Sequence, residues 1–189
     1  MKIKEIIYNG VSNEIKKWNF DEIYVISLFI FFEYDDLRTP ILILGFNTIK
    51  NWQESINLAS NEQEAKWNYA FWLQNEEYQF GYSEDDKKVV ETWIKELNLF
   101  YTDEEEDKYF DKCMELGEQI SIVFTKLCVD VASEIQKNIL PYLTNKKIPI
   151  LVHELEYYDK IVEQNKIINP NGEANEFIKW IYSMWNHPI

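Results

Sequence analysis

The chain has 189 residues, of which 46% are hydrophobic and 16% aromatic, and it contains only 5 glycines and 5 prolines. This composition excludes a disordered or low-complexity protein, and the length suffices to bury one core without disulfides or metals. Nineteen basic residues against 33 acidic ones give a formal net charge of -14, which argues against direct binding to nucleic acids or anionic membranes.

The first part of the chain is expected to form a helix followed by a β-hairpin. Apolar residues recur at helical spacing over residues 3–18, which predicts an amphipathic helix that packs on a core. The run EIYVISLFIFF at 22–32 is apolar on both alternating faces, a pattern typical of a central strand covered on both sides. Turn residues at 34–37 precede a second apolar run at 39–47, so the two runs are expected to pair as antiparallel strands.

The next part is expected to alternate between helix and strand. A short capped helix is expected to reach about Ser60. Over residues 66–82 the aromatic side chains alternate as in a strand, although some would also share a helical face, and we interpret the segment mostly as a strand. Ser83 begins a capping pattern for a helix that extends to about Asn98.

A long helix is expected over residues 103–138. Thr102 and Glu105 match a capping box, and the carboxylates that follow suit the positive end of a helix dipole. Apolar residues continue at helical spacing to the end of the segment, and Gly117 is the expected site of a kink or a split.

The last part is expected to contain a strand that begins at Pro149 and a helix from about Glu173 to about residue 185. The whole chain 1–189 is therefore expected to be a single α+β domain. Its sheet is expected to be largely antiparallel, with strands near 22–32, 39–47, 66–82 and 148–157.

The cysteines and the N-terminal sequence predict a cytoplasmic protein. Cys113 and Cys128 would stand about 22 Å apart on one helix, which excludes a disulfide within it. The N-terminal MKIKEIIYNGV has too short an apolar core for a secretory signal, and no run approaches about 18 apolar residues. A reducing cytoplasm is the expected compartment, with both cysteines as buried core thiols.

No catalytic, cofactor or metal motif is visible in the sequence, because the glycines are too isolated for a nucleotide-binding loop and no G-x-S-x-G occurs. His153, Glu154 and Glu156 form the nearest approach to a functional cluster, since an imidazole beside carboxylates can move protons or bind a metal. HELEYYD lacks the second histidine of the zinc-binding H-E-x-x-H motif, and adjacent strand residues face opposite sides. A solvated strand end is the favoured interpretation.

A non-enzymatic protein that binds a basic protein partner is the function that the sequence favours. Opposite charge accelerates encounter, and tryptophan is frequent at interface hot spots. The candidate contact residues are Asp103, Glu104, Glu105, Glu106, Trp67 and Trp72. The acidic run also has a simple structural explanation as a solvated helix start.

Two other classes stay open. A small enzyme or ligand-binding domain would use His153, Glu154 and Glu156 together with Arg38, the only arginine. A self-associating module would pair through the exposed part of Trp67–Tyr82 with its own copy, and the sequence does not determine the oligomeric state.

Four segments carry a family resemblance: YVISLFIFF in the first strand, GFNT at Gly45–Thr48, EAKWNYAFW at Glu64–Trp72, and ILVHELEYYD near the last strand. Together they resemble a group of small uncharacterised bacterial domains that often occur beside polymorphic toxin genes and are presumed to include immunity proteins. The resemblance implies a protein that neutralises a toxin, and it supplies no catalytic residues. Many such toxins are cationic nucleases, for which an acidic inhibitor is a complementary partner.

Overall fold

The computed structural model describes residues 2–185 and places a four-stranded sheet at the centre of one α+β domain. The strands are β1 (Ile23–Phe32), β2 (Pro40–Thr48), β3 (Tyr78–Phe80) and β4 (Ile150–His153), in the order β3-β2-β1-β4. β2 pairs antiparallel with both β1 and β3, whereas β4 pairs parallel with β1. The expected fold class is confirmed, and the sheet is mixed.

One face of the sheet is covered by α1 (Lys2–Ile15), α4 (Glu84–Glu96) and α6 (Phe110–Asn138). Their apolar stripes pack on alternate strand residues such as Ile26, Leu28 and Ile30. We call this face the first face. The short helices α5 (Asp103–Lys108) and α7 (Leu140–Leu143) flank α6 along the chain.

The opposite face, which we call the second face, carries a second and smaller core. Val25 and Phe29 of β1 and Leu151 of β4 belong to it. The elements on this side are α2 (Ile49–Ser55), η2 (Ile56–Leu58), α3 (Glu62–Trp67), η3 (Tyr69–Phe71), α8 (Asp159–Ile168) and α9 (Asn175–Trp185). β1 is therefore apolar on both faces because a core lies on each side of it, as its sequence predicts.

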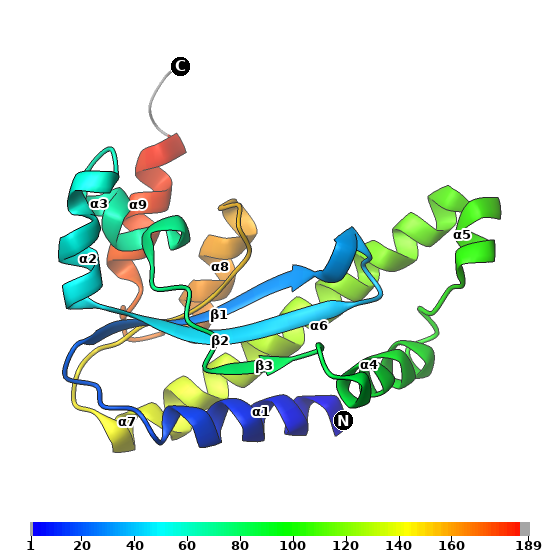
Figure 1. The fold of residues 1–189 in the computed structure, drawn as a ribbon, viewed down its shortest axis with the longest axis horizontal. Coiled ribbons are helices and arrows are strands. Elements are labelled where there is room, and N and C mark those ends of the chain that lie inside the picture. The colour runs from blue at the N-terminus through cyan, green and yellow to red at the C-terminus, as the bar shows by residue number, and fades with distance from the viewer. Residues whose placement is uncertain (1, 186–189) are drawn as a thin grey trace.

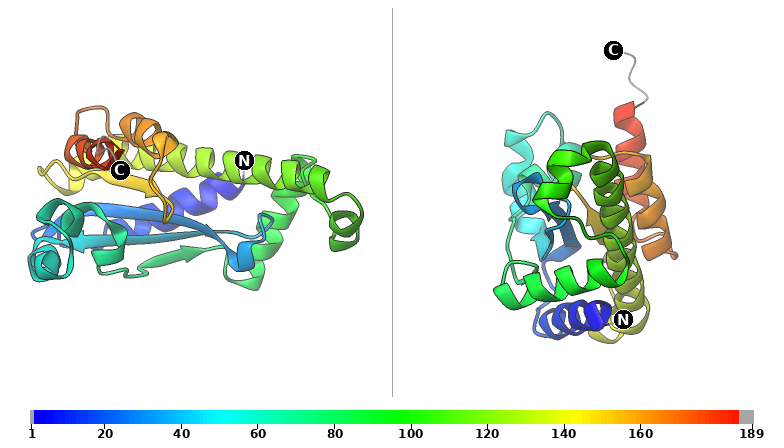
Figure 2. Two further views of the ribbon diagram at one scale, coloured as in Figure 1. Left: turned by 90° about the horizontal axis from the view of Figure 1, so that it is seen from above. Right: turned by 90° about the vertical axis from the view of Figure 1, so that its right-hand side faces the viewer.

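The helices are distributed unevenly along the strands. α2, α3, α8 and α9 gather at one end of the sheet, whereas α4, α5 and the first half of α6 lie at the other end (Figure 1). The views in Figure 2 show α6 running along most of the length of the molecule. The β1–β2 hairpin closes at η1 (Glu33–Asp35), at the end of the sheet away from α2, α3 and α9.

Most of the segment 66–82 is not a strand, contrary to the sequence-based prediction. Asn61 caps α3 by accepting a hydrogen bond from the Glu64 N–H, and Asn68 caps η3 in the same way at Ala70. These local hydrogen bonds compete with strand pairing, so only Tyr78–Phe80 joins the sheet.

The other predicted boundaries differ less. β4 ends at His153 and not near residue 157, and residues 154–158 form the bend that leads into α8. The predicted long helix is divided at Tyr109, whose φ of -134° and ψ of 49° are not helical. It is not split at Gly117, where the absent Cβ instead allows Leu37 to pack close to α6.

Several predicted caps are confirmed by hydrogen bonds. Thr102 and Glu105 form the reciprocal capping box of α5, and the Ser83 hydroxyl accepts from the Asp86 N–H at the start of α4. Within residues 2–185, no helix is long and apolar enough to cross a membrane.

The outer edge of β4 is covered by two buried asparagines of α8. The Asn165 amide accepts from the Val152 N–H and donates to the Val152 carbonyl, both at 2.9 Å. Asn169, one turn later, makes the same pair of bonds with Ile150, at 3.1 and 2.8 Å. Because an amide carries a donor and an acceptor as the backbone does, these side chains stand in for a neighbouring strand.

Candidate functional site

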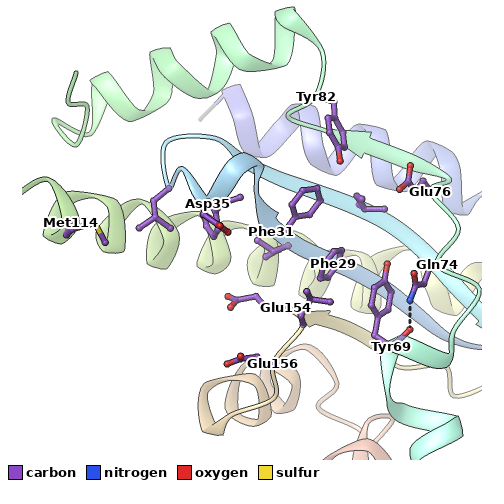
Figure 3. A pocket seen from close by; sticks show the side chains of 15 residues that line it. Phe29, Phe31, Asp35, Tyr69, Gln74, Glu76, Tyr82, Met114, Glu154 and Glu156 are labelled. Atoms are coloured by element: carbon purple, nitrogen blue, oxygen red, sulfur yellow. Dashed lines mark hydrogen bonds between the residues drawn. The ribbon is translucent and has the colours of Figure 1, made fainter. Parts of the chain in front are cut away.

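A groove of about 770 Å³ lies on the second face at the hairpin end of β1. Its floor is a row of aromatic rings, in the order Tyr82, Phe31, Phe29 and Tyr69 (Figure 3). Successive ring centroids along this row are 6.0, 5.5 and 4.8 Å apart. The floor therefore offers continuous aromatic surface, and such surface contributes strongly to binding sites.

Four carboxylates surround this floor: Asp35, Glu76, Glu154 and Glu156. Figure 3 shows Glu76 and Tyr82 on one side of the phenyl rings and Glu154 and Glu156 on the other. No lysine or arginine is among the residues that line the groove, and none of the four carboxylates forms an ion pair within residues 2–185. The groove therefore combines an apolar floor with uncompensated negative charge. We call it the acidic groove.

The Glu76 side of the acidic groove is fastened to β2. The Phe46 N–H donates to the Asn75 side chain at 3.0 Å, and the Leu73 N–H donates to the buried Asn47 at 3.3 Å. A side chain at Gly45 would meet the Asn75 carbonyl, so glycine permits this close approach. The loop between η3 and β3, which carries Glu76, is thus held in place by these contacts.

The opposite side is formed by the residues that follow β4. The Tyr158 hydroxyl donates to the Glu154 carboxylate at 3.0 Å, and the Tyr69 N–H donates to the Tyr157 hydroxyl at 2.9 Å. Leu155, between the two glutamates, is 70% exposed. This rim is positioned by hydrogen bonds and still presents one large apolar side chain to solvent.

His153 lies beneath the groove and not in it. Its side chain is fully buried, and its ring is surrounded by Phe29, Tyr69, Trp72 and Tyr157. Burial lowers the pKa of the imidazole to about 4, so the ring is neutral at physiological pH.

The His153 ring is held between two oxygen atoms. Because the Glu154 carbonyl can only accept, Nδ1 carries the proton at 3.0 Å from it, and Nε2 accepts from the Ser27 hydroxyl at 2.8 Å. This geometry matches that of a nucleophile and its base. However, Ser27 is 3% exposed and neither residue lines the groove, so the pair is sealed from substrate.

Arg38 belongs to a different cluster. Its guanidinium contacts the carboxylates of Asp36 at 2.8 Å, Asp103 at 2.8 Å and Glu106 at 3.6 Å. It also lies 4.7 Å from the centre of the Tyr101 ring. These contacts raise the pKa of Arg38 and join the hairpin to α5. Of the proposed ligand-binding set, Glu154 and Glu156 line the acidic groove, whereas Arg38 and His153 do not.

The predicted partner-binding residues are also divided by the structure. Asp103 and Glu106 face Arg38, Glu105 caps its own helix, and Glu104 is exposed. Trp67 and Trp72 are 3% and 6% exposed and pack in the second core, where the Trp72 indole donates to the Lys66 carbonyl at 2.9 Å. Both tryptophans are core residues and expose little surface.

No family model, curated protein or solved structure matched the chain. The site is therefore interpreted from its own geometry.

Of the groove residues, Tyr69 and Tyr82 fall in the segment that the sequence offered for an interaction surface, whereas Phe29, Phe31 and Glu76 were not singled out. Phe29 and Phe31 belong to β1, whereas Glu76 and Tyr82 flank β3, and only the folded sheet brings these two parts of the chain together. One local signal was visible, because Ser27 is the only polar residue in the run YVISLFIFF apart from its first residue, Tyr24. A polar residue in a buried strand requires a partner, and that partner is His153.

Other chemistry finds little support in the described residues. Cys113 and Cys128 are free and buried, and burial raises the pKa of both thiols. Among residues 2–185, no group of three or more histidine, cysteine, aspartate or glutamate side chains is arranged to hold a metal ion.

Proposed function

We propose that this chain is a non-enzymatic binding protein that captures a cationic protein partner on the acidic groove. The observation that carries the proposal is the groove itself, in which an aromatic floor is surrounded by four carboxylates with no cation in the lining. A partner with apolar side chains and lysine or arginine beside them would satisfy both parts of this surface.

The surroundings of the groove favour a protein partner over a small molecule. Large apolar side chains are also exposed at Tyr34 on the hairpin tip and at Tyr109 and Phe110 where α6 begins. Exposed apolar surface with polar residues around it is typical of protein interaction sites. The formal net charge of -14 adds a long-range attraction for a basic partner.

The resemblance to immunity proteins supports a bacterial toxin, such as a cationic nuclease, as the partner. In that case the protein would act in the cytoplasm by occluding the toxin. The experiment is to purify the chain, together with the product of any toxin-like gene beside its own, and to measure binding and inhibition at low salt. Absence of both binding and inhibition would sink the toxin version of the proposal.

The groove is tested with a pair of charge-matched variants. One replaces Glu76, Glu154 and Glu156 by glutamine, and the control replaces three exposed glutamates elsewhere by glutamine. The control residues are Glu5, Glu96 and Glu118. Both variants have the same net charge, so they separate the groove from the general field.

The groove variant is expected to bind about tenfold more weakly, because three exposed ion pairs contribute on the order of 0.5 kcal/mol each. The control should change binding by less than about threefold, and mainly through the association rate. Equal losses in the two variants would show that the groove is not the docking site.

A further inference from the structure

The acidic groove reaches around the edge of the sheet. Four consecutive residues of β1, Phe29–Phe32, line it. Successive strand side chains point to opposite faces, and the Ile30 side chain is buried in the core of the first face. A cavity confined to the second face would be lined by alternate residues only. The lining also includes Met114, which belongs to α6, and α6 covers the first face. Because residues of both faces line the groove, the groove opens along the strand edge.

This edge is open because β4 is shorter than β1. β4 pairs with β1 only from Ile26 to Phe29, and its last partner is His153. Beyond that point β1 continues to Phe32 and pairs with β2 alone. The segment Ile30–Phe32 is therefore an edge strand, whereas the rest of β1 is central.

The backbone groups at this edge point toward the position that β4 has left. The Ile26 N–H is bonded to the Pro149 carbonyl on the β4 side, and the Glu33 N–H is bonded to the Thr39 carbonyl on the β2 side. Because backbone groups alternate along a strand, Phe32 directs its N–H and C=O away from β2. Within residues 2–185, no hydrogen bond from the Phe32 N–H is found, whereas the Phe32 C=O begins the first turn of η1.

The edge of β1 at Phe32 differs from the outer edge of β4. There, Asn165 and Asn169 occupy the backbone groups of Val152 and Ile150 and close the edge. No comparable side chain closes the edge at Phe32 among the described residues. Natural proteins usually protect exposed strand edges, since these pair readily with other chains.

We infer that the partner docks an extended, basic segment along β1 at Ile30–Phe32, as a strand that continues β4. This inference rests on the proposed function and specifies how the partner is held. A main-chain hydrogen bond from the Phe32 N–H would add to the affinity, as in other cases of strand addition. Alternate side chains of the segment would face the aromatic floor, and its cations would approach Glu154 and Glu156.

Charge argues against a second copy of the chain as the occupant. The loop beside the edge carries Glu154 and Glu156, the hairpin tip carries Asp35, and each copy has a formal net charge of -14. Pairing two such edges would bring like charges together, which is destabilising. Light scattering is therefore expected to show no dimer that depends on this edge.

The test uses three synthetic peptides at low salt, with fluorescence anisotropy for affinity. The first is an alternating Lys-Val peptide with blocked termini. The second has the same sequence with N-methyl groups on alternate backbone nitrogens, which removes the donors on one edge. The third is a Leu-Lys peptide of equal charge with helical periodicity.

The Lys-Val peptide is expected to bind, and its N-methylated form about tenfold more weakly, because methyl groups on the edge that faces β1 block the close approach that the hydrogen bond from the Phe32 N–H requires. The helical peptide should also bind about tenfold more weakly than the Lys-Val peptide, since a helix cannot pair with the edge. Binding should weaken in the groove variant and not in its charge-matched control.

Hydrogen exchange supplies a readout at the edge itself. In the free protein the Phe32 amide should exchange faster than the Phe31 amide, which is bonded to β2. The Lys-Val peptide should slow Phe32 at least about tenfold and leave Phe31 unchanged.

The outcomes separate this inference from the proposed function. Equal affinity of all three peptides, or no protection of Phe32 in the bound state, would overturn strand addition. If the groove variant still binds a basic partner more weakly than the charge-matched control variant does, capture of a cationic partner on the groove holds even though strand addition is wrong. Failure of the Lys-Val peptide to bind at low salt also overturns strand addition, and the proposed function is then judged on the partner itself.

Discussion

Replacement of Asn165 by alanine is expected to be among the most damaging polar substitutions in this protein. The Asn165 side chain is fully buried and makes three hydrogen bonds, one from the Val152 N–H and two to the carbonyls of Val152 and Ile161. The Val152 carbonyl keeps a second donor, the Gln164 amide at 2.7 Å. The Val152 N–H keeps none among the described residues, so it becomes a buried donor without an acceptor.

An unsatisfied buried donor costs about 1–3 kcal/mol, and the lost packing adds about 1 kcal/mol. We therefore expect Asn165→Ala to lower the free energy of unfolding by about 2–4 kcal/mol. The measurement is urea denaturation followed by tryptophan fluorescence, with the slope of the transition compared between variants.

Asn171→Ala is the matched control, because Asn171 is exposed and, among the described residues, its side chain bonds only to Glu173. It should change stability by less than about 0.5 kcal/mol. If Asn165→Ala were equally mild, the view that this amide takes the place of a neighbouring strand would be refuted.

Tyr34 has a φ of 55° and is 93% exposed, so Tyr34→Gly should raise the free energy of unfolding by about 0.5–1 kcal/mol in urea titrations, and a loss of stability would contradict this. The folded-state pKa of His153 is lowered to about 4 from 6.5, so its contribution is complete above pH 6.5 and is lost as the pH falls toward 4. Over that range wild type should lose roughly 3 kcal/mol relative to His153→Gln, and parallel stability curves would refute the assignment. Cys113 and Cys128 should react with a thiol reagent only as fast as the protein unfolds, and rapid labelling of the native state would contradict their burial.

Much of the fold could be predicted from local patterns. The run at 22–32 revealed β1 because both of its faces are apolar, and Thr102 and Glu105 revealed the start of α5 because a capping box is a local motif. The prediction of a strand over most of residues 66–82 is wrong, because aromatic alternation is compatible with either structure and the deciding hydrogen bonds come from Asn61 and Asn68.

The candidate site could be predicted only in part. The composition shows an excess of acidic residues and a high aromatic content, and both kinds of residue line the groove. Composition does not tell whether Trp67 and Trp72 lie at the surface or in the core, because their burial depends on how α3 and η3 fold back onto β1. The open edge at Phe32 depends on where β4 stops, and that is a property of the register between strands more than 100 residues apart.

The single arginine has a practical consequence for studying motion. A protease that cleaves only after arginine has one target bond in this chain, between Arg38 and Thr39. In the folded state the Arg38 guanidinium is occupied by Asp36 and Asp103 and stacked on Tyr101, so it is not free to enter a protease. Cleavage therefore reports how often the hairpin separates from α5. Because Asp35 and Leu37 of the same turn line the acidic groove, a bound partner should slow this cut.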